Sequence, residues 1–367
     1  MMEPIRILHA ADLHLDTVFD GLPDAQAAQR RSEQRKLLDA ILKLAKKQNV
    51  QAVMLPGDLF DSPKTYPETI EAVEQFLTAL EVPVFIAPGN HDFYRAGCAY
   101  DRMFLPENVH MFRHNRIECV EVPELHLRVW GAAFTDSVCP CLIDGFVPDK
   151  QPGTVDILCV HGTASKDGVY NPMPPELLAK TGMDYVAMGH SHSCGGLQKA
   201  GDSYYLWPGV PMGRGFDETG KKGVVIANIA PGQVTAHFAP IHTREYQILE
   251  VDVTDEDPLT AVFQAVRGDT SRDLYRIILT GETKQPIDLP TMQRVLQGRF
   301  YSLEMQSRAR VWQDLWARTE EATLRGAFLR RLRAKLEQAS PEDRTAIEEA
   351  ARWGVAALDG AEEVIAL

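Results

Sequence analysis

Cysteine pairs, long apolar runs and a surplus of positive charge are all lacking in this chain. None of its six cysteines forms a C-x-x-C pair, the spacing typical of zinc and thiol-redox sites. A chain of 367 residues needs no disulfide scaffold, so we expect reduced thiols and a cytoplasmic protein. No apolar run approaches the roughly 20 residues that span a bilayer, and residues 1–4 lack the basic start of a signal peptide. These features argue against a small disulfide-rich secreted protein and against a membrane protein.

The net charge of −13 limits how the chain binds nucleic acid. Nonspecific binding to DNA depends on Lys and Arg side chains that neutralise phosphates. Any DNA-binding surface must therefore be a local basic patch, or the positive charge must come from bound metal ions or from a partner. With 45% hydrophobic and 24% charged residues, the composition is otherwise that of an ordinary globular protein.

Up to residue 87 the pattern predicts alternating strands and helices. Apolar residues such as Phe76, Leu77 and Leu80 have helical spacing, and Pro67 is typical of a helix start. The predicted strands are 5–12, 52–55 and 82–87, and the predicted helices are 28–48 and 67–80. This β-α-β-α-β order predicts parallel pairing of the strands.

Beyond residue 108, strands follow one another without long helices. They are predicted at 117–122, 125–130, 157–160 and 185–188, and then, as antiparallel additions, at 203–207, 223–229 and 234–239. An α/β fold fits this order: a layered sandwich of two mixed β-sheets flanked by helices.

The pattern changes again near residue 246. A small α+β module is predicted over 246–305 and a helical segment over 306–367, so that three parts are expected, the first being 1–245. The helical segment is basic over 307–338 and acidic over 341–363. Its helices either pack on each other and on the module, or offer a docking surface to a partner.

Polar clusters of metal-ligand type come directly after five short apolar runs, each a predicted strand. The clusters are Asp12-Leu13-His14, Gly57-Asp58, Gly89-Asn90-His91-Asp92, His161-Gly162 and Gly189-His190-Ser191-His192. An open α/β sheet builds its site at the carboxyl ends of its strands. Each cluster alone is a weak signal, but five of them predict one site with several metal ligands.

Such a ligand set suits hydrolysis of a phosphate ester by two divalent ions about 4 Å apart. The ions neutralise the phosphate and generate a hydroxide, and one carboxylate must be shared between them. Asp58 is the best candidate for this bridge. Mixed His, Asp and Asn ligands favour Mn²⁺, Fe or Zn²⁺ over Ca²⁺ and Mg²⁺, which prefer oxygen alone.

In order and type, the five clusters resemble those of the calcineurin-like metallophosphoesterase superfamily. Longer stretches resemble the SbcD-type bacterial DNA repair exonucleases, in particular their short YhaO-like branch. These stretches are 11–16, 56–61, 88–92 and 208–218. The module at 246–305 resembles the capping domain of those enzymes.

The resemblance implies a role for each matching residue. The implied metal ligands are, for the first ion, Asp12, His14 and His192, for the bridge, Asp58, and for the second ion, Asn90, His161 and His190. His91 would protonate the leaving oxygen, with Asp92 holding it in place. Some relatives have a histidine where this chain has Asp61. Arg214 is either a phosphate contact, since a guanidinium matches a phosphate, or part of a structural salt bridge.

The resulting hypothesis is a DNA exo/endonuclease of the SbcD type that acts in DNA repair. The expected partners are DNA, an SbcC-like coiled-coil ATPase and, as another assembly, a second copy of the chain in a homodimer. The alternative function is a metallophosphatase or a small phosphodiesterase acting on nucleotides or phosphoproteins. The ligand set is the same in both cases and does not separate them.

Overall fold

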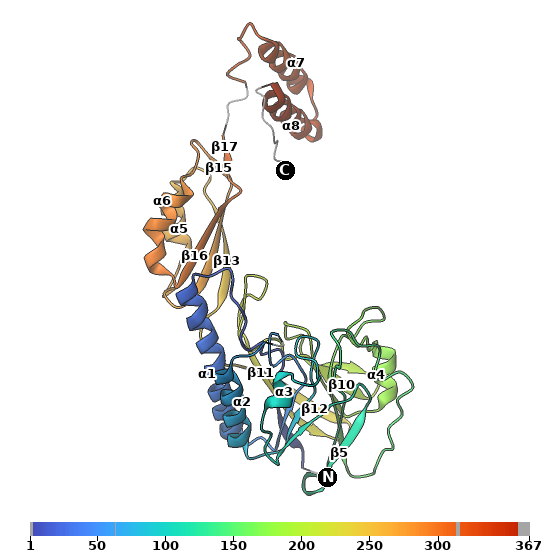
Figure 1. Ribbon diagram of the computed structural model, residues 1–367. Coiled ribbons are helices and arrows are strands. Elements are labelled where there is room, and N and C mark those ends of the chain that lie inside the picture. Colours follow the sequence, from blue (N-terminus) through green and yellow to red (C-terminus); the bar gives the residue numbers. More distant parts are fainter. Residues whose placement is uncertain (1–2, 63, 313–315, 359–367) are drawn as a thin grey trace. The chain divides into compact units, whose positions relative to one another are not determined.

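A computed structural model describes residues 3–62, 64–312 and 316–358 of the chain. The chain divides into two compact units (Figure 1). The first unit consists of Met1–Leu249, Asp269–Arg276 and Leu296–Glu304, and the second of Glu250–Gly268, Ile277–Val295 and Met305–Leu367. Within the described ranges, no helix is both long enough and apolar enough to cross a membrane. The three-part division expected from the sequence stays a prediction.

The first of two six-stranded sheets has the strand order β12-β11-β1-β2-β3-β4. Its strands are β1 (Ile5–His9), β2 (Ala52–Leu55), β3 (Val84–Ile86), β4 (Val109–Met111), β11 (Gly223–Ala230) and β12 (Gln233–Pro240). Strands β1 to β3 pair in parallel, as the β-α-β-α-β pattern predicts, and β4, which was not predicted, pairs in parallel with β3. β11 is antiparallel to both β1 and β12, which confirms the predicted additions in this sheet.

The second sheet has the order β5-β6-β7-β8-β10-β9. Its strands are β5 (Glu118–Val122), β6 (Leu127–Gly131), β7 (Val155–His161), β8 (Tyr185–Gly189), β9 (Gln198–Ala200) and β10 (Ser203–Leu206). The prediction of an antiparallel addition is wrong for the pairing of β10 with β8, which is parallel. The reason is that β9 first returns the chain across the sheet and then pairs antiparallel with β10.

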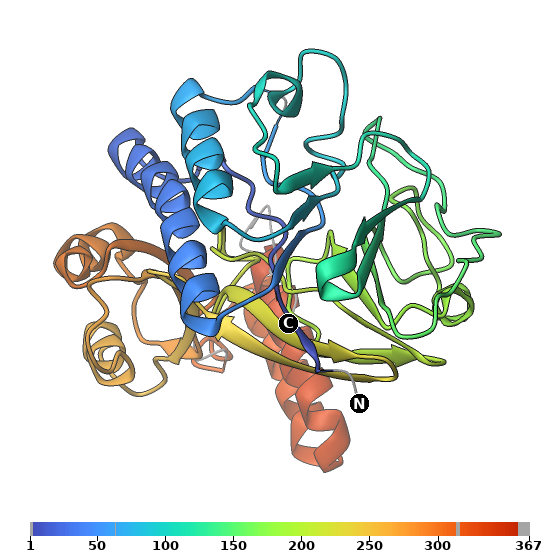
Figure 2. The ribbon, with the colours of Figure 1, turned by 90° about the horizontal axis from the view of Figure 1, so that it is seen from below.

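Helices cover the outer faces of the two sheets, so that the first unit is layered as predicted (Figure 2). α1 (Asp24–Gln48) and α2 (Pro67–Leu80) pack on the first sheet, and α4 (Pro175–Thr181) packs on the second. The short helical segments are α3 (Ala99–Arg102), η1 (Pro123–Leu125) and η2 (Gln297–Arg299). α1 ends at Asn49, whose left-handed backbone caps the helix.

Alternation of side chains along β1 explains why both faces of the first sheet are buried. Ile5 and Ile7 point into the core between the sheets, whereas Leu8 belongs to the core under the helices. A strand buried on both faces is apolar at nearly every position, as β2 and β3 are. This double burial fixes the strand ends from which the site is built.

The segment 246–307 forms alternating strands and helices, which are the elements that the sequence predicts for 246–305. Its three-stranded sheet has the order β13-β14-β16, and its strands are β13 (Tyr246–Asp252), β14 (Leu274–Thr280) and β16 (Ser302–Ser307). Its helices are α5 (Pro258–Ala265) and α6 (Leu289–Leu296). The short strands β15 (Glu282–Thr283) and β17 (Arg310–Val311) pair in parallel.

Two helices, α7 (Leu324–Gln338) and α8 (Pro341–Leu358), lie against each other near the end of the chain (Figure 1). Leu329, Ala351 and Val355 are buried between them, and a Cβ atom at Gly354 would collide with the ring of Phe328. Of the alternatives that the sequence left open, packing of the two helices on each other is present; packing on the module and docking of a partner stay predictions. The prediction of helix from residue 306 is wrong in the described part of 308–323, because α7 begins only where the side chain of Thr323 caps it.

Candidate metal centre

Ligand-type side chains from five strand ends meet in the first unit. They lie at or just after the carboxyl ends of β1, β2 and β3 in the first sheet and of β7 and β8 in the second. The predicted site residues that the structure brings together are Asp12, His14, Asp58, Asn90, His91, His161, His190 and His192. The sheet-edge argument made from the sequence therefore describes the site correctly.

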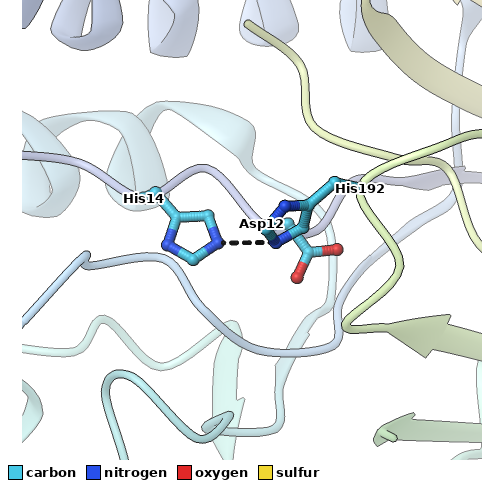
Figure 3. Close-up of side chains that lie close together, drawn as sticks. All are labelled: Asp12, His14 and His192. Carbon is cyan, nitrogen blue, oxygen red and sulfur yellow. Dashed lines mark hydrogen bonds between the residues drawn. The ribbon is translucent and has the colours of Figure 1, made fainter. Parts of the chain in front are cut away.

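Asp12, His14 and His192 form a first group, in which one ligand atom from each residue lies within 4.8 Å of the others. Nε2 of His14 is 3.3 Å from Nε2 of His192 (Figure 3). A carboxylate lies near the Nδ1 atom of each ring: Asp61 at 3.0 Å from His14, and Glu218 at 2.9 Å from His192. With both ring protons on Nδ1, next to these carboxylates, the two Nε2 lone pairs face each other. A cation between them relieves this repulsion, so the group fits a metal ion.

Asp58 lies between the two sets of ligands. It forms one close group with His14 and His91 and another with Asp12 and His161. Its Oδ2 atom is 3.8 Å from Nε2 of His14 and 3.5 Å from Nε2 of His161. The backbone N–H of His91 donates to the other carboxylate oxygen at 2.9 Å. One carboxylate within reach of two histidines from different sheets fits the predicted bridging role.

Asn90, His161 and His190 form a second group. Oδ1 of Asn90 lies 2.8 Å from Nε2 of His161 and 3.2 Å from Nδ1 of His190. Nδ1 of His161 is 3.0 Å from the carbonyl oxygen of Pro56 and therefore carries the ring proton. The Nε2 lone pair of this ring thus faces an amide oxygen. Acceptor atoms converge here as they do in the first group, and the residues fit a second cation.

Burial acts in opposite ways on the histidines and on the carboxylates of the site. It lowers the pKa of His14, His161 and His190 to about 4, so these rings are neutral at neutral pH. Burial raises the pKa of Asp12 and of Asp58, and the nearby charge of Asp58 raises that of Asp12 further. The histidines thus carry no charge to offset the two carboxylates. Divalent cations would supply that positive charge and favour the ionised carboxylates.

Arg214 is engaged by two carboxylates beside the first group. Its Nη2 atom is 2.7 Å from Glu218 and its Nη1 atom is 3.0 Å from Asp61. Burial alone would raise the pKa of Glu218, but hydrogen bonds from His192 and Arg214 outweigh it and lower this pKa to about 2. Of the two sequence-based interpretations of Arg214, the salt bridge is present, and the phosphate contact stays a prediction.

Asp92 does not hold the ring of His91 in the way that the sequence suggested. Its buried carboxylate accepts hydrogen bonds from four backbone N–H groups in the loops after β2 and β3, and from the hydroxyl of Tyr100. Nδ1 of the exposed His91 lies instead 3.0 Å from the carbonyl oxygen of Asp61. Asp92 therefore shapes the loops that carry the ligands, and the orientation of His91 comes from the main chain.

Four of the ligands have a left-handed backbone. The φ angle is 53° at Asp12, 44° at His14, 52° at Asp58 and 98° at His190. Each such residue costs the fold about 1 kcal/mol or more when it is not glycine. Strain of this kind gathers at functional sites, where neighbouring structure holds it in place.

Glycines next to the ligands allow the loops of the two sheets to approach each other. A Cβ atom at Gly89 would collide with the carboxylate of Asp58. At Gly189 it would collide with the carbonyl oxygen of Pro56 and the ring of His161. The Gly-Asn and Gly-His pairs of the sequence are therefore packing requirements as well as markers of the ligands.

Sequence reasoning missed three residues that touch the site. Asp61 and Glu218 act as carboxylate partners of ligand histidines. The ring of Tyr170, which is 37% exposed, lies 5.0 Å from the ring of His190. The sequence holds little signal for these contacts, because each joins segments that are far apart along the chain.

Comparisons with known proteins show the family of the chain. A family model described as calcineurin-like phosphoesterase matches residues 5–194, more than half of the chain, including all the predicted metal ligands. The chain is 28% identical over 284 residues to the uncharacterized metallophosphoesterase YhaO of Bacillus subtilis (strain 168), covering 74% of this chain and 69% of that protein. Among solved structures it is similar to a dimetal phosphatase from Danio rerio, with a TM-score of 0.41 and 12% identity, covering 64% of this chain and 98% of that one. The chain belongs to the calcineurin-like phosphoesterase family and is a metallophosphoesterase.

Proposed function

We propose that this metallophosphoesterase cleaves phosphodiester bonds in DNA with two divalent metal ions, as a nuclease of the SbcD type acting in DNA repair. The observation that carries the two-metal part is Asp58, whose carboxylate lies within 3.8 Å of a histidine from each sheet. When bound, the ions would supply positive charge at the phosphate. They would also lower the pKa of water, so that hydroxide is available as the nucleophile at neutral pH. Mn²⁺ is the ion we propose, because the ligands mix nitrogen and oxygen.

The chain itself orients the reacting groups. The carbonyl oxygen of Asp61 accepts a hydrogen bond from Nδ1 of His91, which leaves the exposed Nε2 atom free to face a substrate. In the protonated ring, Nε2 donates a proton to the leaving oxygen or a hydrogen bond to the phosphate. The backbone N–H of the same residue fixes Asp58, so proton donor and bridging carboxylate share one loop.

Tyr170 supports a nucleic-acid substrate over a smaller ester. Its ring is partly exposed beside the ligand His190. Bases stack on exposed aromatic rings with little sequence preference, and each stack contributes about 1–3 kcal/mol. The alternative, a phosphatase or small phosphodiesterase acting on nucleotides or phosphoproteins, uses the same ligands. A phosphoprotein would gain less from such a ring, whereas the base of a nucleotide would stack on it as a base of DNA does.

A Mn²⁺-dependent assay on linear DNA, p-nitrophenyl phosphate and cyclic nucleotides tests the proposal, with Asp58→Asn as the blank. Tyr170→Ala should slow DNA cleavage and leave hydrolysis of p-nitrophenyl phosphate unchanged. Phe104→Ala, which removes another exposed ring of the first unit, is the matched control. Hydrolysis of small esters without DNA cleavage, even with the partner ATPase present, would contradict the nuclease proposal and support the alternative.

The partner that we propose is an SbcC-like coiled-coil ATPase, bound through α7 and α8. This hairpin exposes apolar side chains, among them Leu324 at 74% and Trp353 at 44%. Arg331, seven residues after Leu324 on α7, is exposed and adds a positive charge near this apolar side chain. A cytoplasmic location belongs to the same proposal, since all six cysteines are free thiols.

Pull-down of the co-expressed ATPase tests this docking surface. The double variant Leu324→Glu, Trp353→Glu should lose the ATPase and keep hydrolysis of a small phosphodiester, whereas Phe104→Glu should keep both. Retained binding in the double variant contradicts the docking role. Sedimentation of the chain alone at increasing concentration tests the homodimer.

A further inference from the structure

We propose that Glu218 and Arg214 are positioning residues for the first metal ion, and that the loop of residues 213–218 holds both histidines of that group from outside. This inference deepens the two-metal function and rests on it. The inference concerns metal binding, so it stands or falls independently of whether the substrate is DNA.

Glu218 fixes the ring of His192. The glutamate side chain is 3% exposed, and its Oε1 atom lies 2.9 Å from Nδ1 of the histidine. A carboxylate only accepts hydrogen bonds when it is ionised, so Nδ1 donates and Nε2 keeps its lone pair for the ion. Carboxylate partners of this kind orient a ligand histidine and make it a stronger base.

Arg214 acts on the carboxylates and not on the ring. Its Nη2 atom is 3.1 Å from Nδ1 of His192 and donates to it only while that nitrogen is unprotonated. Metal binding through Nε2 requires the ring proton on Nδ1, and Nδ1 then has Glu218 as its favourable partner. Arg214 donates to Glu218 from Nη2 at 2.7 Å, from Nε at 3.2 Å and from the backbone N–H at 2.8 Å, and to Asp61 from Nη1 at 3.0 Å. The guanidinium thus neutralises and spaces two carboxylates that would otherwise repel each other.

Asp61 extends the arrangement to the second histidine of the group. Its Oδ1 atom lies 3.0 Å from Nδ1 of His14, although the two are not aligned as in an ideal hydrogen bond. One arginine therefore reaches His14 through Asp61 and His192 through Glu218. No comparable side-chain carboxylate partner occurs at His161 in the described ranges, where the partner of Nδ1 is the carbonyl oxygen of Pro56.

The loop that carries these residues is held on two sides. Arg30, which is fully buried, donates to the carbonyl oxygen of Gly213 at 2.9 Å. The hydroxyl of Tyr246 donates to the carbonyl oxygen of Arg214 at 3.0 Å, and its ring packs edge-on against Phe216 at 5.0 Å. The loop is thus a rigid support, and its position sets where the carboxylates meet the histidines.

Metal binding to the metal-free protein tests the proposal without any substrate. In a His190→Ala background, which removes a ligand of the second group, titration with Mn²⁺ measures the first ion. Adding Glu218→Gln should weaken this ion 10–100-fold, the range typical for the loss of such an outer partner, and Arg214→Met should also weaken it. Glu176→Gln, which removes an exposed carboxylate paired with Lys166 at 3.4 Å, is the matched control and should change nothing.

A second background separates positioning from general damage to the fold. In His192→Ala only the second group is complete, and there Glu218→Gln should leave Mn²⁺ affinity unchanged, because its target ring is gone. Equal weakening in both backgrounds, or no weakening in either, overturns the proposal. If Glu218→Gln does not fold, Tyr246→Phe tests the same proposal, because it removes one hydroxyl that supports the loop of residues 213–218. Unchanged Mn²⁺ affinity of the first group would then overturn the proposal that the loop supports this group. A wild-type protein that binds two ions but cleaves no DNA contradicts the nuclease proposal and leaves this one intact.

Discussion

The two ligand groups of the metal centre are held in different ways. In the first group, Nδ1 of His14 and of His192 each lies beside a side-chain carboxylate. In the second group, Nδ1 of His161 lies beside the carbonyl oxygen of Pro56 in the main chain, and the side-chain amide of Asn171 donates to the carbonyl of the same histidine. A main-chain partner is present whatever side chain the sequence places there, whereas a carboxylate partner is lost with one substitution.

The difference follows from where the groups lie. His161 is the last residue of β7, so the ladder of the second sheet already fixes its backbone. His14 and His192 lie in loops beyond the strand ends, and each needs a partner from another loop. The comparison teaches that the sheet and the main chain position His161, whereas a small set of charged side chains positions His14 and His192.

The largest effect should come from the residue that both groups share. Asp58→Asn should lower phosphodiesterase activity by at least about 10²–10³-fold and weaken both ions, because the amide loses the charge that bridges them. Elemental analysis together with kinetics measures this. Full activity with two bound ions would end the two-metal interpretation and with it the distinction between the groups.

His190→Ala should remove the second ion and keep the first, at a cost of about 10²-fold or more in turnover. The backbone N–H of His190, which donates to Asp12 at 2.9 Å, is unchanged in this variant, so the first group should stay in place. Mn²⁺ titration of the metal-free variant gives the number of ions bound. Loss of both ions would show that the groups depend on each other and would remove the contrast drawn above.

His91→Ala should keep both ions but slow turnover by about 10²-fold, since the ring acts on the substrate. Nevertheless, one atom of this ring lies within 4.8 Å of ligand atoms of His14 and Asp58. Kinetics on protein of known metal content separates the two roles. If an ion is lost, His91 belongs to the ligands, and the first group is larger than described.

The smallest effect concerns His9, a buried histidine outside both groups. Burial lowers its pKa to about 3, and its ring lies between the hydroxyl of Tyr185 and the carbonyl oxygen of Met188. The unfolded chain binds a proton below its ordinary pKa of 6.5, and the folded chain does not. Stability should therefore fall as the pH drops below 6.5, by up to about 1.4 kcal/mol per pH unit from this residue.

Urea unfolding of the metal-free protein at pH 7.5 and 5.5 measures this loss, with His9→Gln for comparison. The variant should lose about 1 kcal/mol less than the wild type between the two pH values, because the other groups cancel in the difference. An equal loss in both proteins would mean that burial alone does not keep such a ring neutral. The neutrality of the ligand histidines would then need another cause.

The convergence of the candidate ligands could be predicted because a short local pattern in the sequence marks each of them. Each ligand follows an apolar run that becomes a buried strand, and parallel strands bring their carboxyl ends to one edge. The partners of the ligands were not predictable, because Glu218 and Asp61 meet His192 and His14 through loops whose paths depend on the whole fold.

Errors in the predicted elements have similar causes. β10 pairs in parallel with β8 because β9 lies between them in the chain and reverses its direction. β9 has only three residues, which is too short for a periodic pattern that the sequence could reveal. The charges of 307–338 suggested one helix, but the helix needs the cap at Thr323 and the packing of Phe328 against Gly354. Asp92 follows His91 directly, yet its carboxylate is buried among backbone N–H groups, since neighbouring loop residues point in opposite directions.

The left-handed backbone at Asp12, His14 and Asp58 places selection for activity in conflict with selection for a larger free energy of unfolding. At such positions glycine removes the steric conflict, and substitutions compatible with the backbone typically change the free energy of unfolding by about 0.4–1 kcal/mol. Drift in a lineage that no longer needs catalysis should therefore replace these ligands with glycine or asparagine first. A chain that keeps all three, as this one does, carries a backbone cost at the residues that are its candidate metal ligands.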